Sequence, residues 1–450
     1  MATEAPLTFL GTADSIPAAL SRRRAARSAV RSPLKVGIEA ADALNGHRAI
    51  GRYARELPRA LLHVASRGEL DLRCLLFGLG CRERSRTFSA ALHGAGAGRI
   101  RTLDLPGKIL HLFWNRLPFP AIESFLGPLD IVHAVSFLTP PARRAARTIL
   151  TMHGIVNFVR PDLLDPRLIQ DLAPRWDFYL RRADWIISVS ETARRDFLER
   201  FDFPPERIRA VPLGVSAEFR PLEAGEIERK LAQRFGYLGI RRPYILFVGG
   251  MERVKNVRTL LEAYALLVER RKLPHTLVLA GPPGNGSEEV HAGLKRPGIA
   301  ERVKFAGSIG QTGYDLPVLY GGADLFVHPS LYEGWASPPL EAMACGTPVV
   351  ASNAASLPET CGDGALYADP LDAEAQAAAM ERALTEESSR AELIRRGRAW
   401  SARWSWERTA EDTLGLYREA AAEGPRARPR RVRKRSASVE SPESLSVAVG

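Results

Sequence analysis

The chain has 450 residues, of which 45% are hydrophobic and 25% are charged, and its formal net charge is +12. This length and composition predict a soluble globular protein of two domains, and they exclude a disordered chain and, because no apolar run approaches the ~20 residues required, a membrane-spanning helix. Four cysteines, with neither Cys-x-x-Cys nor zinc-finger spacing, exclude a disulfide-rich scaffold and favour reduced thiols.

Most of the positive charge lies in the two terminal segments. Residues 1–33 carry five Arg and two acidic residues, and residues 424–450 carry six Arg, one Lys and two Glu. Only +4 of the net charge belongs to the central 390 residues. Residues 21–31 are compatible with a short basic helix, but neither segment has a core-forming pattern. We expect disordered extensions at 1–33 and 422–450, the second rich in Arg.

From Leu34 the pattern changes to strands that alternate with helices. Apolar runs predict strands at residues 35–40, 72–77, 131–135, 149–152, 185–189 and 208–211. Helical spacing of apolar residues predicts helices at 50–64, 169–182 and 191–201. Such alternation is typical of a parallel, doubly wound sheet, so we expect a first α/β domain at residues 34–220.

A second series of strands begins at Tyr244. Strands are predicted at residues 244–248, 276–280, 303–305, 325–327, 349–351 and 365–367, with a helix at 256–270 after the first of them. The charged stretch at 221–243 is expected to hold one helix and a linker. We therefore expect a second doubly wound domain at 221–403, facing the first across a cleft, and a closing helix at 404–421.

Residues 329–351 read Pro-Ser-Leu-Tyr-Glu-Gly-Trp-Ala-Ser-Pro-Pro-Leu-Glu-Ala-Met-Ala-Cys-Gly-Thr-Pro-Val-Val-Ala and are the most informative part of the chain. Glu333 and Glu341 stand eight residues apart, after one predicted strand and before the next. The carboxyl end of a parallel strand is where open α/β sheets bind ligands, and carboxylates accept hydrogen bonds from hydroxyl groups. An ordinary strand–helix–strand unit with two solvated Glu side chains is the alternative.

The helix predicted inside this segment adds an anion site. Ser337 is expected to cap the helix, and Pro338 to occupy its first position. Free backbone N–H groups around Ala336, Ser337 and Leu340 would then bind a phosphate at the positive end of the helix. Backbone amides that bind phosphate would thus lie beside carboxylates that bind hydroxyls. This combination favours a ligand that contains both a phosphate and a sugar.

The same segment resembles the signature of the retaining glycosyltransferases of family 4, a Glu-x7-Glu motif followed by the run Glu-Ala-Met-Ala-Cys-Gly-Thr-Pro-Val-Val. The resemblance extends over residues 34–421 and implies the GT-B fold, in which two doubly wound Rossmann-like domains face each other across a cleft. It also implies that the last helix, 404–421, crosses back to the first domain. By resemblance, Glu333 approaches the transferred sugar and Glu341 holds the ribose hydroxyls.

Two segments of the first domain match the family in part. Residues 46–53, Gly-His-Arg-Ala-Ile-Gly-Arg-Tyr, resemble its Gly-Ile-Gly-Arg-Tyr loop, which places Gly51 near the acceptor or the donor phosphate, with a simple tight turn as the alternative. The motif Gly-x-Gly-x-x-Gly is absent, which argues against an NAD enzyme. His153 follows a predicted strand, where the family has a His-Asp pair whose His contacts the transferred sugar; here Gly154 replaces the Asp.

Two segments of the second domain complete the predicted donor site. Residues 249–256 read Gly-Gly-Met-Glu-Arg-Val-Lys-Asn, where the family uses a basic pair to bind the donor diphosphate. Lys255 falls on that pattern, Arg253 is shifted from it, and Gly250 occupies the earlier position. Residues 303–308, Val-Lys-Phe-Ala-Gly-Ser, end a predicted strand and include Gly307; by resemblance, backbone atoms of this segment hold the nucleobase.

The resemblance implies an activity and its partners. We expect a retaining glycosyltransferase that moves a hexosyl group from a nucleotide diphosphate sugar, bound by the second domain, to a glycan or lipid-linked acceptor that enters from the first. Similarity to mannosyltransferases of bacterial surface-polysaccharide assembly favours GDP-mannose. The chain has no Asp-x-Asp motif, so we expect no metal site, and no cofactor other than the nucleotide sugar as co-substrate.

A non-catalytic nucleotide-sugar or glycan-binding protein is the main alternative, because Gly154 and the altered basic pair depart from the family's pattern. Nucleic-acid binding is disfavoured, because the Arg-rich tail lacks interleaved aromatic residues. The first 33 residues lack the long apolar core of a secretory signal. We therefore expect a cytoplasmic protein, and peripheral contact of its basic tails with the anionic inner face of a membrane stays open.

Overall fold

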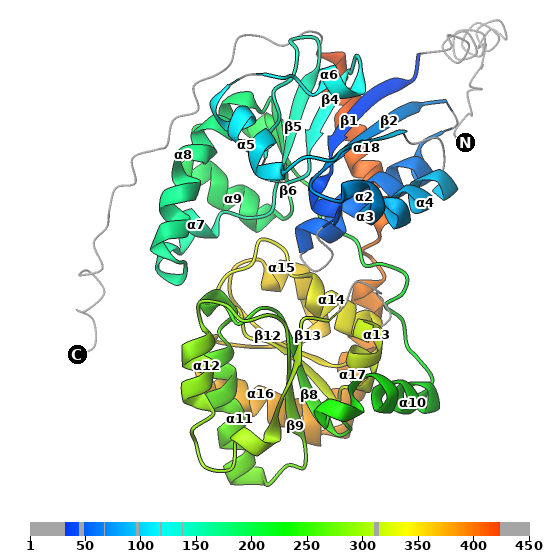
Figure 1. Ribbon diagram of the computed structural model, residues 1–450. Coiled ribbons are helices and arrows are strands. Elements are labelled where there is room, and N and C mark those ends of the chain that lie inside the picture. Colours follow the sequence, from blue (N-terminus) through cyan, green and yellow to red (C-terminus); the bar gives the residue numbers. More distant parts are fainter. Residues whose placement is uncertain are drawn as a thin grey trace, which may run out of the picture.

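The structure is a computed structural model that describes residues 32–44, 49–66, 68–95, 99–117, 119–136, 138–309 and 315–423. These residues form two α/β lobes that face each other, the first above the second in Figure 1. The expected basic helix at 21–31 and nearly all of the two expected extensions lie outside the described residues. Both doubly wound sheets are present, so the predicted fold class is confirmed.

The first lobe contains a parallel sheet of seven strands in the order β3-β2-β1-β4-β5-β6-β7. Its strands are β1 (Leu34–Glu39), β2 (Leu70–Phe77), β3 (Arg99–Leu103), β4 (Ile131–Ala134), β5 (Arg147–Met152), β6 (Trp185–Ser188) and β7 (Ile208–Ala210). Its helices are α2 (Ala49–Val64), α3 (Cys81–Arg84), α4 (Arg86–Ala95), α5 (Gly107–Arg116), α6 (Glu123–Leu126), α7 (Val156–Val159), α8 (Pro166–Arg182) and α9 (Glu191–Arg200).

The second lobe contains a parallel sheet of six strands in the order β10-β9-β8-β11-β12-β13. Its strands are β8 (Tyr244–Val248), β9 (Thr276–Ala280), β10 (Val303–Gly307), β11 (Leu325–His328), β12 (Val349–Ser352) and β13 (Ala365–Ala368). Its helices are α10 (Ala224–Phe235), α11 (Val257–Arg271), α12 (Ser287–Gly293), α13 (Asp315–Gly322), α14 (Ser337–Ala344), α15 (Leu357–Cys361), α16 (Ala373–Thr385) and α17 (Glu387–Ser401).

The strands were readable from the sequence because most of them are covered on both faces. Every residue of β4, β5, β6, β11 and β12 is buried. In the first sheet, Val36 and Ile38 pack into one apolar core, and Leu150 and Ile186 pack into a second core. A strand that is buried on both faces appears in the sequence as an unbroken apolar run.

Strand β3 is not predicted by the sequence analysis, for the opposite reason. It lies at the edge of the first sheet, beside β2, and its five residues are only partly buried or exposed. Two of them are Arg99 and Arg101, which are exposed. An edge strand with arginines on its exposed side has no apolar run, and such charges protect the edge from pairing with another chain.

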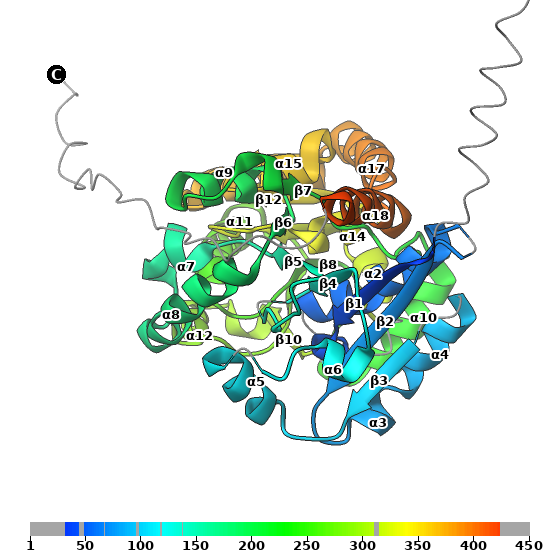
Figure 2. The same cartoon turned by 90° about the horizontal axis from the view of Figure 1, so that it is seen from above.

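Helix α18 (Trp406–Ala422) leaves the second lobe and packs on α2 of the first, as the resemblance implies. Figure 2 shows it at the same edge of the molecule as α17, the helix that precedes it. The backbone N–H of Val215 donates to the carbonyl of Trp404 at 3.1 Å. The two segments that connect the lobes therefore run side by side.

A buried chain of hydrogen bonds fixes α18 to the first sheet. His133 at β4 lies 2.6 Å from the Tyr417 hydroxyl of α18 through Nδ1, and 2.7 Å from the Thr151 hydroxyl of β5 through Nε2. Thr151 in turn lies 3.0 Å from the Tyr53 hydroxyl of α2. All four side chains are fully buried. Burial lowers the pKa of His133 to about 3, so the ring is neutral at physiological pH.

Replacing His133 by glutamine should weaken the loss of stability at acidic pH. Between its usual pKa of 6.5 and its folded pKa of about 3, His133 binds a proton in the unfolded chain but not in the folded protein. Above a pH of about 6.5 the protonation of His133 therefore costs no stability. Below it, the free energy of unfolding decreases as the pH falls, and the decrease due to His133 is about 2 kcal/mol at a pH of about 5.

Urea unfolding of the wild type and the variant at neutral and at mildly acidic pH measures this difference. His291→Gln on α12 is the control, because this side chain is exposed and should leave the wild-type profile unchanged. Identical pH dependence in the wild type and His133→Gln would contradict the prediction.

Candidate active site

Two of the predicted site residues follow the strands at which the second sheet changes direction. In the second sheet, β8 leads to β9 and β10 on one side, and β11 leads to β12 and β13 on the other. Lys255 follows β8 and Glu333 follows β11. Open α/β sheets bind ligands at the carboxyl ends of such neighbouring strands, where the two loops diverge and leave space between them.

Glu333, Lys255 and His328 form one cluster at this point, which we call the Glu333 cluster. Glu333 Oε1 accepts hydrogen bonds from Lys255 Nζ at 2.7 Å and from His328 Nε2 at 2.9 Å. The side chains of Glu333 and Lys255 are 11% and 23% exposed, so both remain within reach of a ligand. The structure thus brings together the two residues that the resemblance assigns to the sugar and to the diphosphate.

Glu333 and Lys255 are both ionised in the folded protein. Burial raises the pKa of Glu333, but the Lys255 ammonium and the hydrogen bond from His328 outweigh it and lower the pKa to about 2. Burial lowers the pKa of Lys255, but the Glu333 charge outweighs it, and the net direction is upward. Glu333 is therefore a carboxylate and Lys255 a cation at physiological pH, so Glu333 cannot serve as an acid.

His328 is a residue of this cluster that the sequence analysis does not identify. It ends β11, is fully buried, and lies between the rings of Phe247 and Phe326, with centroids at 6.4 Å and 6.0 Å. Burial lowers its pKa, so the ring is neutral and Nε2–H donates to the Glu333 carboxylate. The sequence offered one signal for His328, which is its position directly after the predicted strand 325–327 and before the Glu-x7-Glu motif.

Glu341 is held between the two lobes. It is 3% exposed, and its Oε2 accepts a hydrogen bond from the Tyr320 hydroxyl of α13 at 3.0 Å. Its Oε1 pairs with the Arg52 guanidinium of α2, which also lies over the Phe219 ring at 5.1 Å from its centroid. Arg52 is a further residue that the sequence analysis does not single out. A ribose that bonds to Glu341 has to share or displace this contact.

Gly51 lies in the first turn of α2, one residue before Arg52, and is buried. Residues 45–48 of the matching loop lie outside the described residues. The buried hydroxyl of Tyr53 points to Thr151, and its ring packs against the His153 ring at a centroid distance of 5.1 Å. The Gly-Arg-Tyr part of this motif thus connects the signature helix with His153.

His153 lies beside the Glu333 cluster. Its Nε2 donates to the carbonyl of Val135 at 2.8 Å, so the neutral ring carries its proton on Nε2, and burial lowers its pKa. A Cβ atom added to Gly334 would lie 2.1 Å from the His153 carbonyl oxygen, and one added to Gly154 would lie 3.0 Å from Gly334 Cα. The backbones of the two lobes therefore touch here.

This contact explains the glycine that replaces the family's Asp. Gly154 has a φ of +111°, a left-handed conformation that favours glycine, and a Cβ atom there would make an unusually close contact with Gly334. A glycine at this position therefore suits the close approach of the two lobes.

The start of α14 differs from the prediction. The helix begins at Ser337, with Ala336 as its N-cap, and no side chain caps it. The predicted cap by Ser337 is therefore wrong, and Pro338 occupies the second helical position instead of the first. The helix starts one residue early because Pro338 and its successor fix helical φ without an N–H to satisfy.

The two prolines also limit the amides available to an anion. Pro338 and Pro339 have no N–H, and the Leu340 N–H is the first that a helix bonds internally. Ala336 and Ser337 are then the residues of this helix end whose amides are free of helical bonds. The Leu340 side chain is fully buried in the core.

Arg253, Gly250 and Gly307 are the other predicted donor residues of the second lobe. Arg253 is 47% exposed and pairs with Glu289 of α12 at 2.8 Å, so the structure does not bring it to Glu333. Gly250 follows β8 and is partly buried. Gly307 ends β10, the edge strand of the second sheet, with a φ of +67° and open space around it.

Metal chemistry was not expected, and the described residues contain no group of three or more His, Cys, Asp or Glu side chains arranged to hold an ion. All four cysteines are unpaired and buried. In the same described part of the chain, no helix is long and apolar enough to cross a bilayer.

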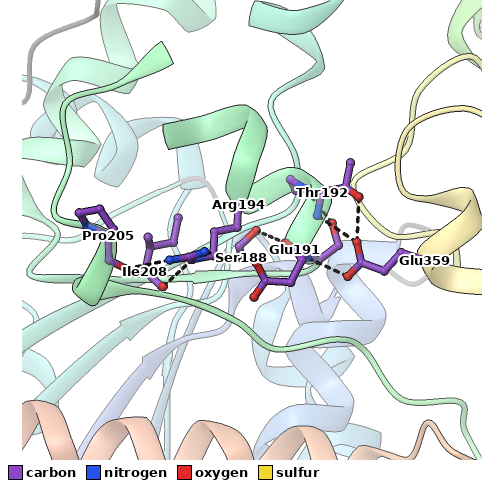
Figure 3. A network of polar contacts seen from close by, with 9 residues as sticks. Ser188, Glu191, Thr192, Arg194, Pro205, Ile208 and Glu359 are labelled. Carbon is purple, nitrogen blue, oxygen red and sulfur yellow. Dashed lines mark hydrogen bonds and ion pairs between the residues drawn. The ribbon is translucent and has the colours of Figure 1, made fainter. Parts of the chain in front are cut away.

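A second interlobe contact lies at the start of α9 (Figure 3). The Glu359 carboxylate of α15 accepts hydrogen bonds from the backbone N–H of Glu191 at 2.7 Å and of Thr192 at 2.9 Å, and from the Thr192 hydroxyl at 2.8 Å. Tyr332 of the signature donates to Asp196 of the same helix at 2.8 Å. A carboxylate at a helix N-terminus is favourable, so α9 docks the two lobes together.

Replacing Glu359 by alanine should loosen the lobes. The variant loses three hydrogen bonds to one carboxylate, and we expect the free energy of unfolding to fall by about 2 kcal/mol and the particle to become less compact. Calorimetry and small-angle X-ray scattering measure the two effects. Glu392→Ala, on an exposed face of α17, is the control. A wild-type melting temperature and radius of gyration would contradict the assigned role of Glu359.

Each lobe of the chain matches a family of known proteins. The family model described as "Glycosyltransferase Family 4" matches residues 50–219, and the model described as "Glycosyl transferases group 1" matches residues 237–400. O-antigen chain mannosyltransferase B of Escherichia coli is 32% identical over 376 residues, which cover 82% of this chain and 95% of that protein.

A further relative and two solved structures extend the comparison. D-inositol 3-phosphate glycosyltransferase of Salinispora tropica is 35% identical over 255 residues, or 54% of this chain and 52% of that protein. Sucrose-phosphate synthase of Thermosynechococcus elongatus superimposes with a TM-score of 0.66 at 22% identity, covering 88% of this chain and 100% of that one. Anabaena HepE in complex with UDP and glucose gives 0.59 at 18% identity, covering 86% and 100%. These two structures share the fold.

Proposed function

The chain belongs to the family 4 glycosyltransferases, and on that premise we propose that it is a retaining mannosyltransferase that uses GDP-mannose and a glycan or lipid-linked acceptor. The Glu333 cluster carries this proposal. It places an ionised carboxylate and a cation 2.7 Å apart at the switch point of the second sheet, next to the backbone of His153 from the first lobe. The name of the Escherichia coli relative supports mannose as the transferred sugar.

The donor diphosphate would lie between Lys255 and the start of α14. Lys255 then exchanges its contact with Glu333 for the phosphate oxygens, and the amides of Ala336 and Ser337 approach the same group. Glu341, on the same helix, would accept hydrogen bonds from the ribose once Arg52 yields. The Lys255 cation and the helix amides would thus lie next to the diphosphate, on which negative charge grows as the sugar leaves.

The transfer step breaks the bond between the anomeric carbon and the diphosphate oxygen and forms a bond to an acceptor hydroxyl. We propose that the acceptor attacks from the face that the diphosphate leaves, so that configuration is retained and the acceptor proton passes to a departing phosphate oxygen. Glu333, ionised beside the sugar, stabilises the oxocarbenium-like state. Lys255 stabilises the leaving group, the kind of electrostatic effect that dominates many enzymes.

A panel of nucleotide sugars tests the proposal. We expect GDP-mannose to raise the melting temperature more than UDP-glucose or UDP-galactose does, and to yield GDP on incubation. NMR of the product should show the α-configuration of the donor. If no nucleotide sugar is cleaved although one binds, the protein is a binder and the proposed activity is refuted.

Excess EDTA should leave the transfer rate within about twofold of its untreated value, because Lys255 and helix amides take the place of a bound cation. Rates before and after dialysis against EDTA, and after adding back Mg²⁺ or Mn²⁺, measure this. Loss of activity on chelation that either ion restores would show that the enzyme requires a metal.

A further inference from the structure

Two side chains donate hydrogen bonds to Glu333, and they differ in how firmly they are held. Lys255 Nζ, at 2.7 Å from Oε1, ends a long side chain that is 23% exposed and has many rotatable bonds. His328 Nε2, at 2.9 Å from the same oxygen, belongs to a ring that is fully buried. The two partners can therefore respond differently when a donor enters the site.

The fold fixes the His328 ring in place. His328 ends β11, an inner strand of the second sheet that is paired with β8 on one side and with β12 on the other. The rings of Phe247 and Phe326 are stacked against it, at interplanar angles of 18° and 23°. Because protein interiors are close-packed, a buried ring between two others has little room to turn.

The surroundings of the ring also fix its proton. An ionised carboxylate only accepts hydrogen bonds, so the proton on Nε2 points to Glu333. Ser330 Oγ lies 3.2 Å from the same nitrogen and is then a second acceptor. At the other side of the ring, Nδ1 is buried and has no hydrogen-bond partner among the described residues. A proton on Nδ1 would be a buried, unpaired donor, so the ring stays neutral and donates through Nε2.

The charges around Glu333 show which partner can remain during the reaction. Burial raises the pKa of Glu333, and Lys255 and His328 are the groups that lower it. Burial, and then the Glu333 charge, raise the pKa of the Cys361 thiol of α15, so this neighbour stays neutral. Glu252 is near enough to act on Lys255. Once Lys255 turns to a diphosphate, His328 is the donor that stays with Glu333.

We propose that His328 is a positioning residue for the transfer step, which holds the Glu333 carboxylate ionised and directed at the sugar after Lys255 has moved to the donor diphosphate. The inference rests on the proposed function, in which Lys255 exchanges its partner. His328 touches neither sugar nor nucleotide in this role and acts through Glu333. Both hydrogen bonds described above end on Oε1, which leaves Oε2 to face the sugar.

Two substitutions of His328 separate its hydrogen bond from its packing. His328→Phe keeps an aromatic ring between Phe247 and Phe326 but removes the N–H group. His328→Gln removes the ring but keeps an N–H donor. His275→Gln is the control, because this histidine also lies near a carboxylate, 3.8 Å from Asp324, but precedes β9 at the amino edge of the same sheet.

The substitutions should change turnover and leave binding almost unchanged. For GDP release from GDP-mannose by the full-length protein, we expect His328→Phe to lower kcat at least about 100-fold. The KM for GDP-mannose and the calorimetric affinity for GDP should stay within about threefold of the wild type. His328→Gln should keep kcat within about tenfold, and His275→Gln should keep the wild-type rate. Wild-type turnover of His328→Phe, or equally slow His328→Gln, would overturn the positioning role.

The pH profile distinguishes this role from a loss of packing. The kcat profile reports the donor-bound enzyme, in which Lys255 contacts the diphosphate, whereas kcat/KM reports the free enzyme, in which Lys255 still pairs with Glu333. Without the N–H of His328, the pKa of Glu333 rises, so the acid limb of kcat should move to higher pH by more than that of kcat/KM. Lost packing alone would slow His328→Phe without moving either limb, and that result would contradict the inference.

Nitrogen-15 NMR of the wild type decides the matter if His328→Phe does not fold. The His328 signals, assigned by their absence in His328→Gln, should show a protonated Nε2 and an unprotonated Nδ1 at neutral pH, both without GDP and with it. A proton on Nδ1 in either state would overturn the inference.

GDP release by the wild type separates this inference from the proposed function. If the wild type releases no GDP from GDP-mannose, the proposed function fails. If it releases GDP and His328→Phe has the same rate and the same acid limb, only the positioning role of His328 fails.

Discussion

Replacing Glu333 by glutamine should lower the transfer rate about 1,000-fold while the affinity for free GDP changes little. The amide keeps the size of the side chain but removes the charge that faces the sugar as positive charge develops at the anomeric carbon. GDP lacks that sugar, so the substitution removes no contact that Glu333 would make with GDP. Measuring kcat by GDP release, and GDP affinity by calorimetry, tests both statements.

The matched control is Glu289→Gln, which removes an ion-paired carboxylate of the same lobe that contacts Arg253 instead of Lys255. It should transfer sugar at the wild-type rate. Turnover of Glu333→Gln within about tenfold of the wild type would show that this carboxylate does not stabilise the transition state.

Replacing Lys255 by methionine should lower kcat by about 100- to 1,000-fold and also raise the KM for the donor. Methionine fills most of the space of the lysine side chain but carries no charge, so the departing diphosphate loses its side-chain cation. The effect differs from that of Glu333→Gln, because the diphosphate is present in the ground state as well as in the transition state.

The pH profile gives a second readout of Lys255→Met. In the wild type, Lys255 and His328 hold the pKa of Glu333 at about 2 against burial, so Glu333 stays ionised down to strongly acidic pH. Without the cation, the effect of burial is less opposed and the pKa rises. The acid limb of kcat should therefore move to higher pH in the variant.

Lys304→Met, a lysine of β10 whose ammonium donates to the carbonyl of Glu301, is the control and should keep the wild-type profile. An acid limb at the same pH in the wild type and in Lys255→Met would show that the cation does not hold Glu333 in its charged form.

Much of the fold could be predicted from the sequence, because most strands are buried on both faces. The strands of the second lobe match their predicted ranges to within two residues, as at β9 (Thr276–Ala280) and β12 (Val349–Ser352). Edge strand β3 could not be predicted, since its exposed arginines leave no apolar run. The helix start at Ser337 was displaced by one residue, because proline fixes the backbone without needing a cap.

The site was predicted where a motif is contiguous and missed where a contact joins distant segments. Glu333 and Glu341 belong to one signature. Arg52 lies in the segment that resembles the Gly-Ile-Gly-Arg-Tyr loop and His328 at the end of a predicted strand, but Arg52 stands 289 residues from Glu341, and neither local pattern indicates which residue the side chain contacts. Glu359 and α9 likewise meet only because the lobes pack together.

The sequence by itself determined the family, the two doubly wound sheets and the position of the acidic signature, because hydrophobic periodicity and motifs are local properties of a chain. Tertiary structure alone decided which charges meet. Lys255 lies 2.7 Å from Glu333 although 78 residues separate them, and Glu39 of β1 accepts a hydrogen bond from Ser136, which follows β4, across 97 residues. The energies of such pairs depend on distance and burial, which only the packing of the sheets fixes.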